Sequence, residues 1–167
     1  MTRLKSKTNL NHKKTFTSYV EIKNIISQIL FGEDLSNILD VILLHLEDKL
    51  PKARASILLF DKKNNCLRNI AAPSLPESFC QLIDGIKIGP KVGSCGTAAY
   101  FKSTTVVRDT FSDPLWATYL EAAKTFNLRS CWSVPILNMK GELLGTLALY
   151  YGTPHKPTQA ESILVKE

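Results

Sequence analysis

The sequence predicts an α+β fold with a central antiparallel sheet of about five or six strands. Three observations lead to this class. Amphipathic helical patterns lie at the two ends and in the middle of the chain, and the clearest strands come as two hairpins. Helices do not alternate regularly with single strands, which argues against a doubly wound parallel sheet. We therefore expect terminal helices on one face of the sheet and the middle helices, with a pocket, on the other.

Length and composition fit one soluble globular domain. The 167 residues are 44 % hydrophobic and 22 % charged, which is enough for a self-standing core. No stretch approaches the roughly 20 apolar residues of a membrane helix, and the start does not resemble a secretory signal. Four cysteines form no C-x-x-C pair and have no zinc-type spacing: Cys66, Cys80, Cys95 and Cys131. We expect a reduced, cytoplasmic location and no metal site.

The formal charge of +6 is concentrated at the N-terminus. Residues 1–14 contain five basic residues and no acidic one, whereas the rest of the chain is nearly balanced. A basic tail can contact nucleic acid or an anionic membrane. No aromatic residues interleave these charges, so a disordered, solvated leader over residues 1–15 is the better interpretation. The folded domain is then expected over residues 16–167, without a nucleic-acid partner.

Helices are predicted at both ends of this domain. Residues 16–31 have apolar side chains near a 3.6-residue period, and Gly32 ends that segment. A wider apolar stripe runs through residues 35–50, with Asp34 as its N-cap. A third helix starts at Thr158, which forms a capping box with Glu161.

Five strands are predicted between these helices. Residues 55–60 form a continuous apolar run, typical of a strand covered on both faces, and residues 66–72 return as its hairpin partner. Residues 104–108 are β-branched. Residues 130–137 and 143–151 form a second hairpin, in which Gly141 supplies a positive φ and Pro135 implies an edge or a bulge.

The middle of the chain supplies short helices around a glycine-rich loop. Residues 76–83 are predicted as a helix that starts near Pro76, and residues 97–101 as another, after a loop over residues 85–96. Asp113-Pro114 is a strong helix start, and Asn127 suits the left-handed position after that helix.

The loop contains the most unusual motif. Gly93-Ser94-Cys95-Gly96-Thr97 delivers a helix N-terminus whose free N–H groups could hold a small anion or a carboxylate. The alternative is a tight turn capped by Ser94 or Thr97. The helix dipole would favour the thiolate of Cys95, although a buried structural cysteine is the more common case. A Cys–His nucleophile pair is poorly supplied, because the chain has only three histidines.

Aromatic and polar residues downstream are further candidates for a pocket. Tyr100, Trp116 and Trp132 could line a small-molecule site or pack in the core. Arg129, at the start of a strand, could clamp an anion or lie at the strand edge.

Five segments together resemble the GAF family of small-molecule sensor domains. They are residues 55–61, 93–100, 113–116, 129–136 and 141–150, and the resemblance covers roughly residues 16–167. It implies a profilin-like fold, an antiparallel sheet with a ligand pocket between the sheet and the middle helices. It also implies terminal helices that pair in a homodimer and continue into an output domain. The chain stops about three turns into its last predicted helix, which agrees with a helix truncated before such a domain.

The family contains several functions, and the residues separate them. GAF-type free methionine-(R)-sulfoxide reductases share a similar turn, so Cys95 aligns with one of their thiols. Their catalytic cysteine would fall within residues 116–128, which contain none, and Cys131 lies in the following strand instead. Bilin-binding relatives attach chromophore to a cysteine commonly followed by histidine, and no Cys-His pair occurs here. Haem-binding relatives need a pocket histidine, and none occurs between residues 46 and 154.

The resemblance thus predicts a non-catalytic cytoplasmic sensor domain of the kind found in bacterial signalling proteins. A small ligand or anion would control a linked histidine kinase, diguanylate cyclase or cyclic-di-GMP phosphodiesterase. The alternatives are a thiol enzyme like the sulfoxide reductases, using Cys95 with Cys80 or Cys131, and a ligand-free dimerisation module. The predicted ligand-binding residues are Ser94, Cys95, Gly96, Thr97, Tyr100, Trp116, Arg129, Cys131, Trp132 and Ser133.

Overall fold

The computed structural model describes residue 23 and residues 25–165. The predicted basic leader and the first part of the predicted 16–31 helix lie outside the described residues. The chain divides into two compact units, and the second unit begins at Leu43. In the first unit, residues 25–30 are helical, and Gly32 follows with a φ of 73°. Helix α2 (Leu35–Lys49) confirms the predicted helix over residues 35–50, and from Leu43 onward it belongs to the second unit.

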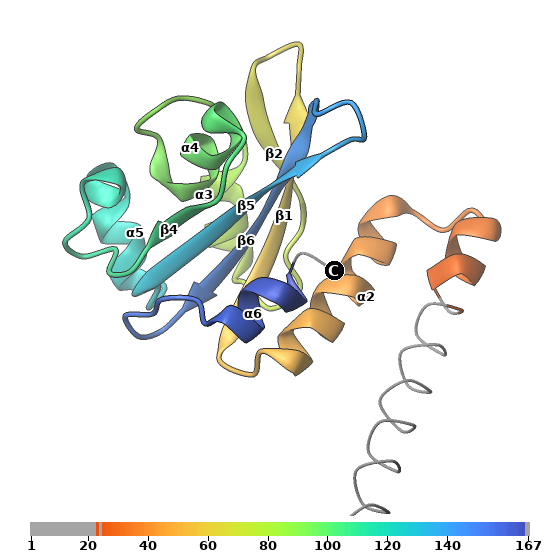
Figure 1. Ribbon diagram of the computed structural model, residues 1–167, viewed down its shortest axis with the longest axis horizontal. Helices are drawn as coiled ribbons and strands as arrows, with labels where there is room; N and C mark the ends of the chain where they lie inside the picture. Colours follow the sequence, from red (N-terminus) through yellow and green to blue (C-terminus); the bar gives the residue numbers. More distant parts are fainter. Residues whose placement is uncertain (1–22, 24, 166–167) are drawn as a thin grey trace, which may run out of the picture. The chain divides into compact units, whose positions relative to one another are not determined.

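The second unit is built on one six-stranded antiparallel sheet, which confirms the predicted fold class (Figure 1). The strand order is β3-β2-β1-β6-β5-β4, so the last strand pairs beside the first. Ala53 of β1 lies opposite Tyr151 of β6, and Leu59 lies opposite Gly145. The strands are β1 (Ala53–Asp61), β2 (Cys66–Ala71), β3 (Ile86–Lys87), β4 (Thr105–Val107), β5 (Ser130–Leu137) and β6 (Leu143–Tyr151).

The two predicted hairpins are present with their expected turn chemistry. Asp61 accepts a hydrogen bond from the Asn64 backbone at 3.0 Å and closes the β1–β2 turn. Gly141 has a φ of 74° in the β5–β6 turn, as its position predicted. Pro135 lies beyond the three residues of β5 that pair with β4, and the β5–β6 register shifts between Ile136 and Leu137. The prediction of an edge or a bulge at Pro135 is therefore confirmed.

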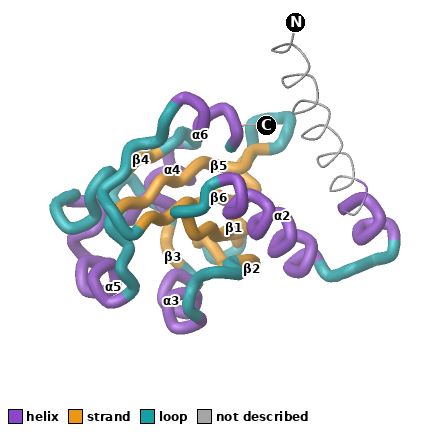
Figure 2. The backbone as a smooth tube through the Cα atoms, turned by 90° about the horizontal axis from the view of Figure 1, so that it is seen from below, coloured by secondary structure: helices purple, strands orange, loops and turns teal. Residues whose placement is uncertain are grey.

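The helices of this unit cover both faces of the sheet. Figure 2 shows α3 (Glu77–Ile83) and α5 (Leu120–Thr125) on one side of the strands and α6 (Gln159–Leu164) on the other. Thr158 and Glu161 form the predicted capping box of α6. The main core lies between the sheet and the middle helices, where the Phe79 ring of α3 packs at 5.5 Å from the Tyr150 ring of β6.

Two of the middle segments differ from the sequence prediction. Helix α4 (Gly93–Phe101) starts at Gly93 and not at Thr97, because packing against the sheet overrides the poor helix propensity of its two glycines. The helix expected after Asp113 begins there, but it is split into the 3₁₀ helix η1 (Pro114–Tyr119) and α5. A 3₁₀ turn aligns residues i and i+3, which brings Trp116 and Tyr119 to the same side. Strand β3, only two residues long, was not predicted.

Candidate functional site

Helix α4 packs directly on the face of the sheet that borders the main core, and its first turn is closely packed. Its residues from Gly93 to Ala99 are all buried. A Cβ atom on Gly96 would come within 2.5 Å of the Lys87 carbonyl oxygen, so only glycine fits there. Glycine at this position lets the helix start approach the Ile86–Lys87 strand and fixes where Cys95 sits.

Thiols and hydroxyls form a buried cluster beneath α4, which we call the polar cluster. The thiol of Cys95 lies 3.2 Å from the Ser133 hydroxyl, and the Cys131 thiol lies 3.7 Å from the same oxygen. The Tyr150 hydroxyl lies 3.3 Å from the Ser56 hydroxyl and 3.9 Å from the Cys95 sulfur. All five side chains are buried, so these groups satisfy one another in place of water.

The polar cluster shifts the ionisation of its thiols in opposite directions. The Cys131 thiol, followed by the hydroxyls of Ser133 and Tyr150, lowers the pKa of Cys95 to about 7 against the effect of burial. Burial, together with the neighbouring Cys95, raises the pKa of Cys131 well above its usual value. Cys95 is therefore the thiol that ionises first. None of the four cysteines, all in the described part of the chain, forms a disulfide.

A small, partly open cavity adjoins the polar cluster at the N-terminal end of α4. Its volume is about 20 Å³, roughly the space of one water molecule. The indole N–H of Trp116 donates to the Ser94 hydroxyl at 2.8 Å beside this cavity. Apolar and aromatic side chains fill the rest of the space, so no small organic ligand fits without movement of the helices. Its lining includes Phe79, Ile83, Ser94, Cys95, Trp116, Tyr119 and Tyr150.

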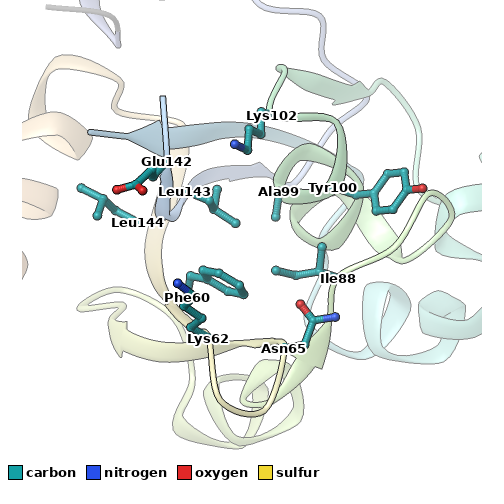
Figure 3. A pocket seen from close by; sticks show the side chains of 10 residues that line it. All are labelled: Phe60, Lys62, Asn65, Ile88, Ala99, Tyr100, Lys102, Glu142, Leu143 and Leu144. Carbon is teal, nitrogen blue, oxygen red and sulfur yellow. The ribbon is translucent and has the colours of Figure 1, made fainter. Parts of the chain in front are cut away.

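A much larger hollow, which we call the α4 cleft, opens at the other end of the helix. Its volume is about 470 Å³, within the range of about 300–1,000 Å³ typical of small-molecule sites. Figure 3 shows Phe60, Ile88, Ala99 and Leu143 converging on its centre, while the Tyr100 ring points away. The cleft is lined by Phe60, Lys62, Asn65, Ile88, Ala99, Tyr100, Lys102, Glu142, Leu143 and Leu144.

The rim of the α4 cleft is polar and charged. The Lys102 ammonium donates to the Gly141 carbonyl oxygen at 2.8 Å and so joins the end of α4 to the β5–β6 turn. Glu142 accepts a hydrogen bond from the Asn138 side chain at 2.7 Å. Lys62 is exposed, and within the described residues its ammonium makes no hydrogen bond or ion pair. The cleft thus combines an apolar floor with a cation that is free to meet a ligand.

The predicted site residues are divided among three places. Cys95, Cys131 and Ser133 meet in the polar cluster, and Ser94 lies beside it, bonded to Trp116. Gly96 and Thr97 are buried in the first turns of α4, and the Thr97 hydroxyl accepts from the Val92 backbone at 3.3 Å. Tyr100 lines the α4 cleft.

The other two predicted residues lie away from both hollows. Arg129 forms a two-point ion pair with Asp109, at 2.6 Å and 3.2 Å, and stacks over the Phe111 ring. Trp132 faces the opposite side of the sheet, because neighbouring residues of a strand alternate between its faces. This alternation is a signal in the sequence that could have separated Trp132 from Cys131 and Ser133.

Most residues that line the α4 cleft were not predicted from the sequence. Its floor residues come from four separate segments, and each reads locally as an ordinary core position. Lys62 and Asn65 belong to a hairpin turn, where charged and polar residues are common. The one weak signal in the sequence is the presence of hydrophobic residues, such as Ile88, in the loop before α4. Hydrophobic residues in a loop indicate that the loop packs against another apolar surface.

No helix in the described part of the chain is both long and apolar enough to span a bilayer. The same residues contain no group of three or more His, Cys, Asp or Glu side chains placed to hold a metal ion.

Comparison with known proteins places this architecture in a family. The model of the GAF domain matches residues 32–167. A methyl sulfide methyltransferase-associated sensor from Methanosarcina acetivorans is 28 % identical over 137 residues, which is 82 % of this chain. The chain spans only 14 % of the length of that relative.

Two solved structures share the fold at lower identity. A domain of a putative sensor histidine kinase from Sinorhizobium meliloti has a TM-score of 0.64 and 23 % identity, covering 80 % of this chain and 84 % of that one. The fRMsr of Staphylococcus aureus, in complex with its substrate, has a TM-score of 0.62 and 22 % identity, covering 89 % and 88 %. The fold and the family match together define a sensor-type α+β domain. The chain belongs to the GAF domain family, as its sequence motifs predicted.

Proposed function

We propose that this chain is a sensory domain that binds a small ligand in the α4 cleft and regulates a linked output domain, such as a histidine kinase, a diguanylate cyclase or a cyclic-di-GMP phosphodiesterase. The observation that carries the proposal is the preformed 470 Å³ cleft between the sheet and the end of α4. Its size and its apolar floor with a polar rim are typical of small-molecule sites. The sensor relative and the sensor kinase domain of the same fold support a signalling role.

The lining of the cleft defines the class of ligand. The floor of Phe60, Ile88 and Leu143 suits an apolar or aromatic body. Lys62 is the rim cation that has no partner within the described part of the chain, so it would pair with a negative group on the ligand. Glu142 and Lys102 are engaged in bonds across the rim and would position the turn that borders the ligand. The proposed ligand is a small organic anion with an apolar body.

Strand β6 provides a direct route from the cleft to the last helix. Leu143 and Leu144, at the start of β6, line the cleft where the β5–β6 register is irregular. Tyr151, at the other end of β6, donates a hydrogen bond to Glu161 of α6 at 3.2 Å. A ligand that favours one arrangement of the irregular start of β6 would shift the population of states felt at α6.

A thermal-shift screen of the purified chain tests the proposal. The panel contains aromatic and aliphatic carboxylates, amino acids, methionine sulfoxide, nitrate and cyclic nucleotides. A specific ligand at 100 times its dissociation constant adds about 2.7 kcal/mol, which raises the unfolding midpoint by about 5 to 10 °C.

Two matched variants assign a hit to the cleft. Leu144→Trp adds bulk at the cleft, and Leu137→Trp adds the same bulk on the neighbouring strand, outside it. We expect Leu144→Trp and Lys62→Glu to abolish the shift and Leu137→Trp to retain it. A flat screen, or a hit that survives both cleft variants, would contradict the proposal.

A thiol enzyme is the second candidate, and the polar cluster is the observation that favours it. Two cysteines share one serine hydroxyl, and the pKa of Cys95 is lowered to about 7. Reduction of a sulfoxide by these thiols would yield the thioether, water and a Cys95–Cys131 disulfide, which an added dithiol would reduce. The 20 Å³ cavity leaves no room for methionine sulfoxide, so we propose that the domain is not an enzyme. Turnover of free methionine-(R)-sulfoxide that is lost in Cys95→Ser would reverse this assignment.

The remaining proposals concern assembly and location. We propose a cytoplasmic location for the domain. We also propose a homodimer through the terminal helices, because apolar side chains such as Leu30 and Phe31 are largely exposed in the first unit. Light scattering of the purified chain tests the dimer. A monomer at all concentrations, or a dimer that persists when Phe31 is changed to Ser, would contradict it.

A further inference from the structure

A second open hollow lies on the other face of the sheet, away from α4. We call it the β4 cleft, and its volume is about 410 Å³. One wall is the exposed edge strand β4 with the residues that flank it, and the other is the segment that leads into α6. Its floor is the side chain of Trp132, which lies opposite Val106 in the β4–β5 pairing. The residues used below are Thr104, Arg108, Trp132, Lys156 and Ser162.

Trp132, which lines the β4 cleft, carries an unsatisfied hydrogen-bond donor. Trp132 is only 4 % exposed, and its indole nitrogen is buried with no hydrogen-bond partner among the described residues. Buried donors of this kind are rare, because each loses its bond to water without gaining another. The other tryptophan of the chain shows the ordinary case, since Trp116 donates to Ser94 at 2.8 Å.

The walls of the β4 cleft are positively charged. Arg108 and Lys156 both line it, and within the described residues neither side chain makes a hydrogen bond or an ion pair. Among the residues that the structure describes, no acidic side chain lines the cleft. The nearest carboxylates in the sequence are already engaged, since Asp109 pairs with Arg129 and Glu161 bonds to His155. Two unpaired cations thus share a hollow that has no counter-charge of its own.

We propose that the β4 cleft binds a phosphate group, either as the free ion or carried on a small molecule. Arg108 and Lys156 would meet its two negative charges, and a small movement of the Trp132 side chain would bring its buried indole N–H to one of the phosphate oxygens. The hydroxyls of Thr104 and Ser162 offer further polar contacts. A carboxylate carries one charge and would leave one cation unmatched. This site is separate from the α4 cleft, so it stands or falls independently of the proposed sensory function.

Nuclear magnetic resonance of the two indole N–H groups tests this directly. The full chain is titrated with inorganic phosphate, glycerol phosphate or acetate at constant ionic strength and about pH 8, where phosphate is a dianion. We expect a saturable shift of the Trp132 indole signal and no shift of the Trp116 signal, which is an internal control. Loss of one peak in Trp116→Phe assigns the two signals without altering the β4 cleft.

Charge-neutral variants then assign the phosphate to the two cations. Arg108→Gln and Lys156→Gln should each weaken binding about fivefold, and the double variant should weaken it by more than about tenfold. The matched control, Lys91→Gln with Lys140→Gln, removes the same charge from exposed positions outside the cleft and should leave binding unchanged.

Each outcome decides the proposal. Tighter binding of glycerol phosphate than of phosphate identifies a phosphorylated molecule as the ligand, and equal or weaker binding identifies the free ion. A silent Trp132 signal overturns the proposal, as does a shift that the control pair weakens as much as the double variant does. Acetate binding as tightly as phosphate would overturn the assignment of a dianion.

Discussion

The two ends of helix α4 border hollows of opposite character. At the N-terminal end, the buried thiols and hydroxyls bond to one another, and a cavity of only about 20 Å³ remains. At the C-terminal end, about 470 Å³ stays open above an apolar floor, with the Lys62 ammonium exposed on its rim. Polar residues beneath a helix start are therefore not by themselves a ligand site. In this chain they join the helix to the sheet, and the larger open space lies at the other end of α4.

The largest expected effect is a difference in stability loss between a variant at the small cavity and a variant at the α4 cleft. Trp116→Ala removes a side chain that is 5 % exposed and donates to Ser94, so it should cost about 3–5 kcal/mol and lower the unfolding midpoint by roughly 10 °C. Leu144→Ala, at a residue that is 47 % exposed on the cleft, should cost less than about 1 kcal/mol. Denaturant unfolding of both variants measures the difference. Equal losses would contradict the distinction.

A glycine pair tests how closely α4 approaches the sheet edge. Gly96→Ala places a Cβ within 2.5 Å of a backbone oxygen, and we expect a loss of about 1–3 kcal/mol. Gly141→Ala, in the turn beside the α4 cleft, meets no atom within 4 Å and should cost only the strain of its positive φ, about 1 kcal/mol. The comparison is made by chemical unfolding. A larger loss at Gly141 would show that α4 is less tightly seated than described.

The polar cluster should make stability depend on pH. The pKa of Cys95 falls from 9.0 to about 7 on folding, so the unfolded chain binds more protons between these values. The contribution of Cys95 to stability should therefore rise as pH increases from about 7 toward 9, and be lost as pH falls through 7. Cys95→Ser should flatten this rise, whereas Cys66→Ser should keep it. A profile that is unchanged in Cys95→Ser would rule out the thiol as its cause.

The smallest expected effect concerns the rim of the α4 cleft. Lys102→Met removes an exposed hydrogen bond between α4 and Gly141, which should cost less than about 1 kcal/mol of global stability. Hydrogen exchange in the β5–β6 turn should nevertheless quicken, because this bond holds the turn over the cleft. Lys91→Met, at an exposed lysine outside the cleft, serves as the control. Unchanged exchange in Lys102→Met would show that the bond does not order the rim.

Local patterns predicted most of the fold. The apolar run of residues 55–60 became the doubly covered strand β1, and Asp113-Pro114 and Thr158 with Glu161 start helices where their capping chemistry placed them. These features depend on neighbours within a few residues. The division of the helix after Asp113 into η1 and α5 could not be predicted in this way, because Trp116 is held by a contact with Ser94, 22 residues earlier.

The candidate site was harder to predict for the same reason. The motif Gly93-Ser94-Cys95 stands out in the sequence, but its polar groups are satisfied by Ser133 and Trp116, which are distant in the sequence. The α4 cleft exists only where four segments meet, so no single segment indicates it. Strand alternation alone indicates that Cys131 and Trp132 lie on opposite faces of the sheet, so the two residues could not have been predicted to share one pocket.

A crystallographic fragment screen of the chain tests the central claim most directly, because it locates a ligand site without a named ligand. The account predicts that fragments with an apolar body and an acidic group collect in the α4 cleft, against Phe60 and Leu143 and near Lys62. It also predicts that the small cavity lined by Cys95 and Trp116 stays without fragments. Fragments that widen the small cavity and leave the α4 cleft empty would contradict the account.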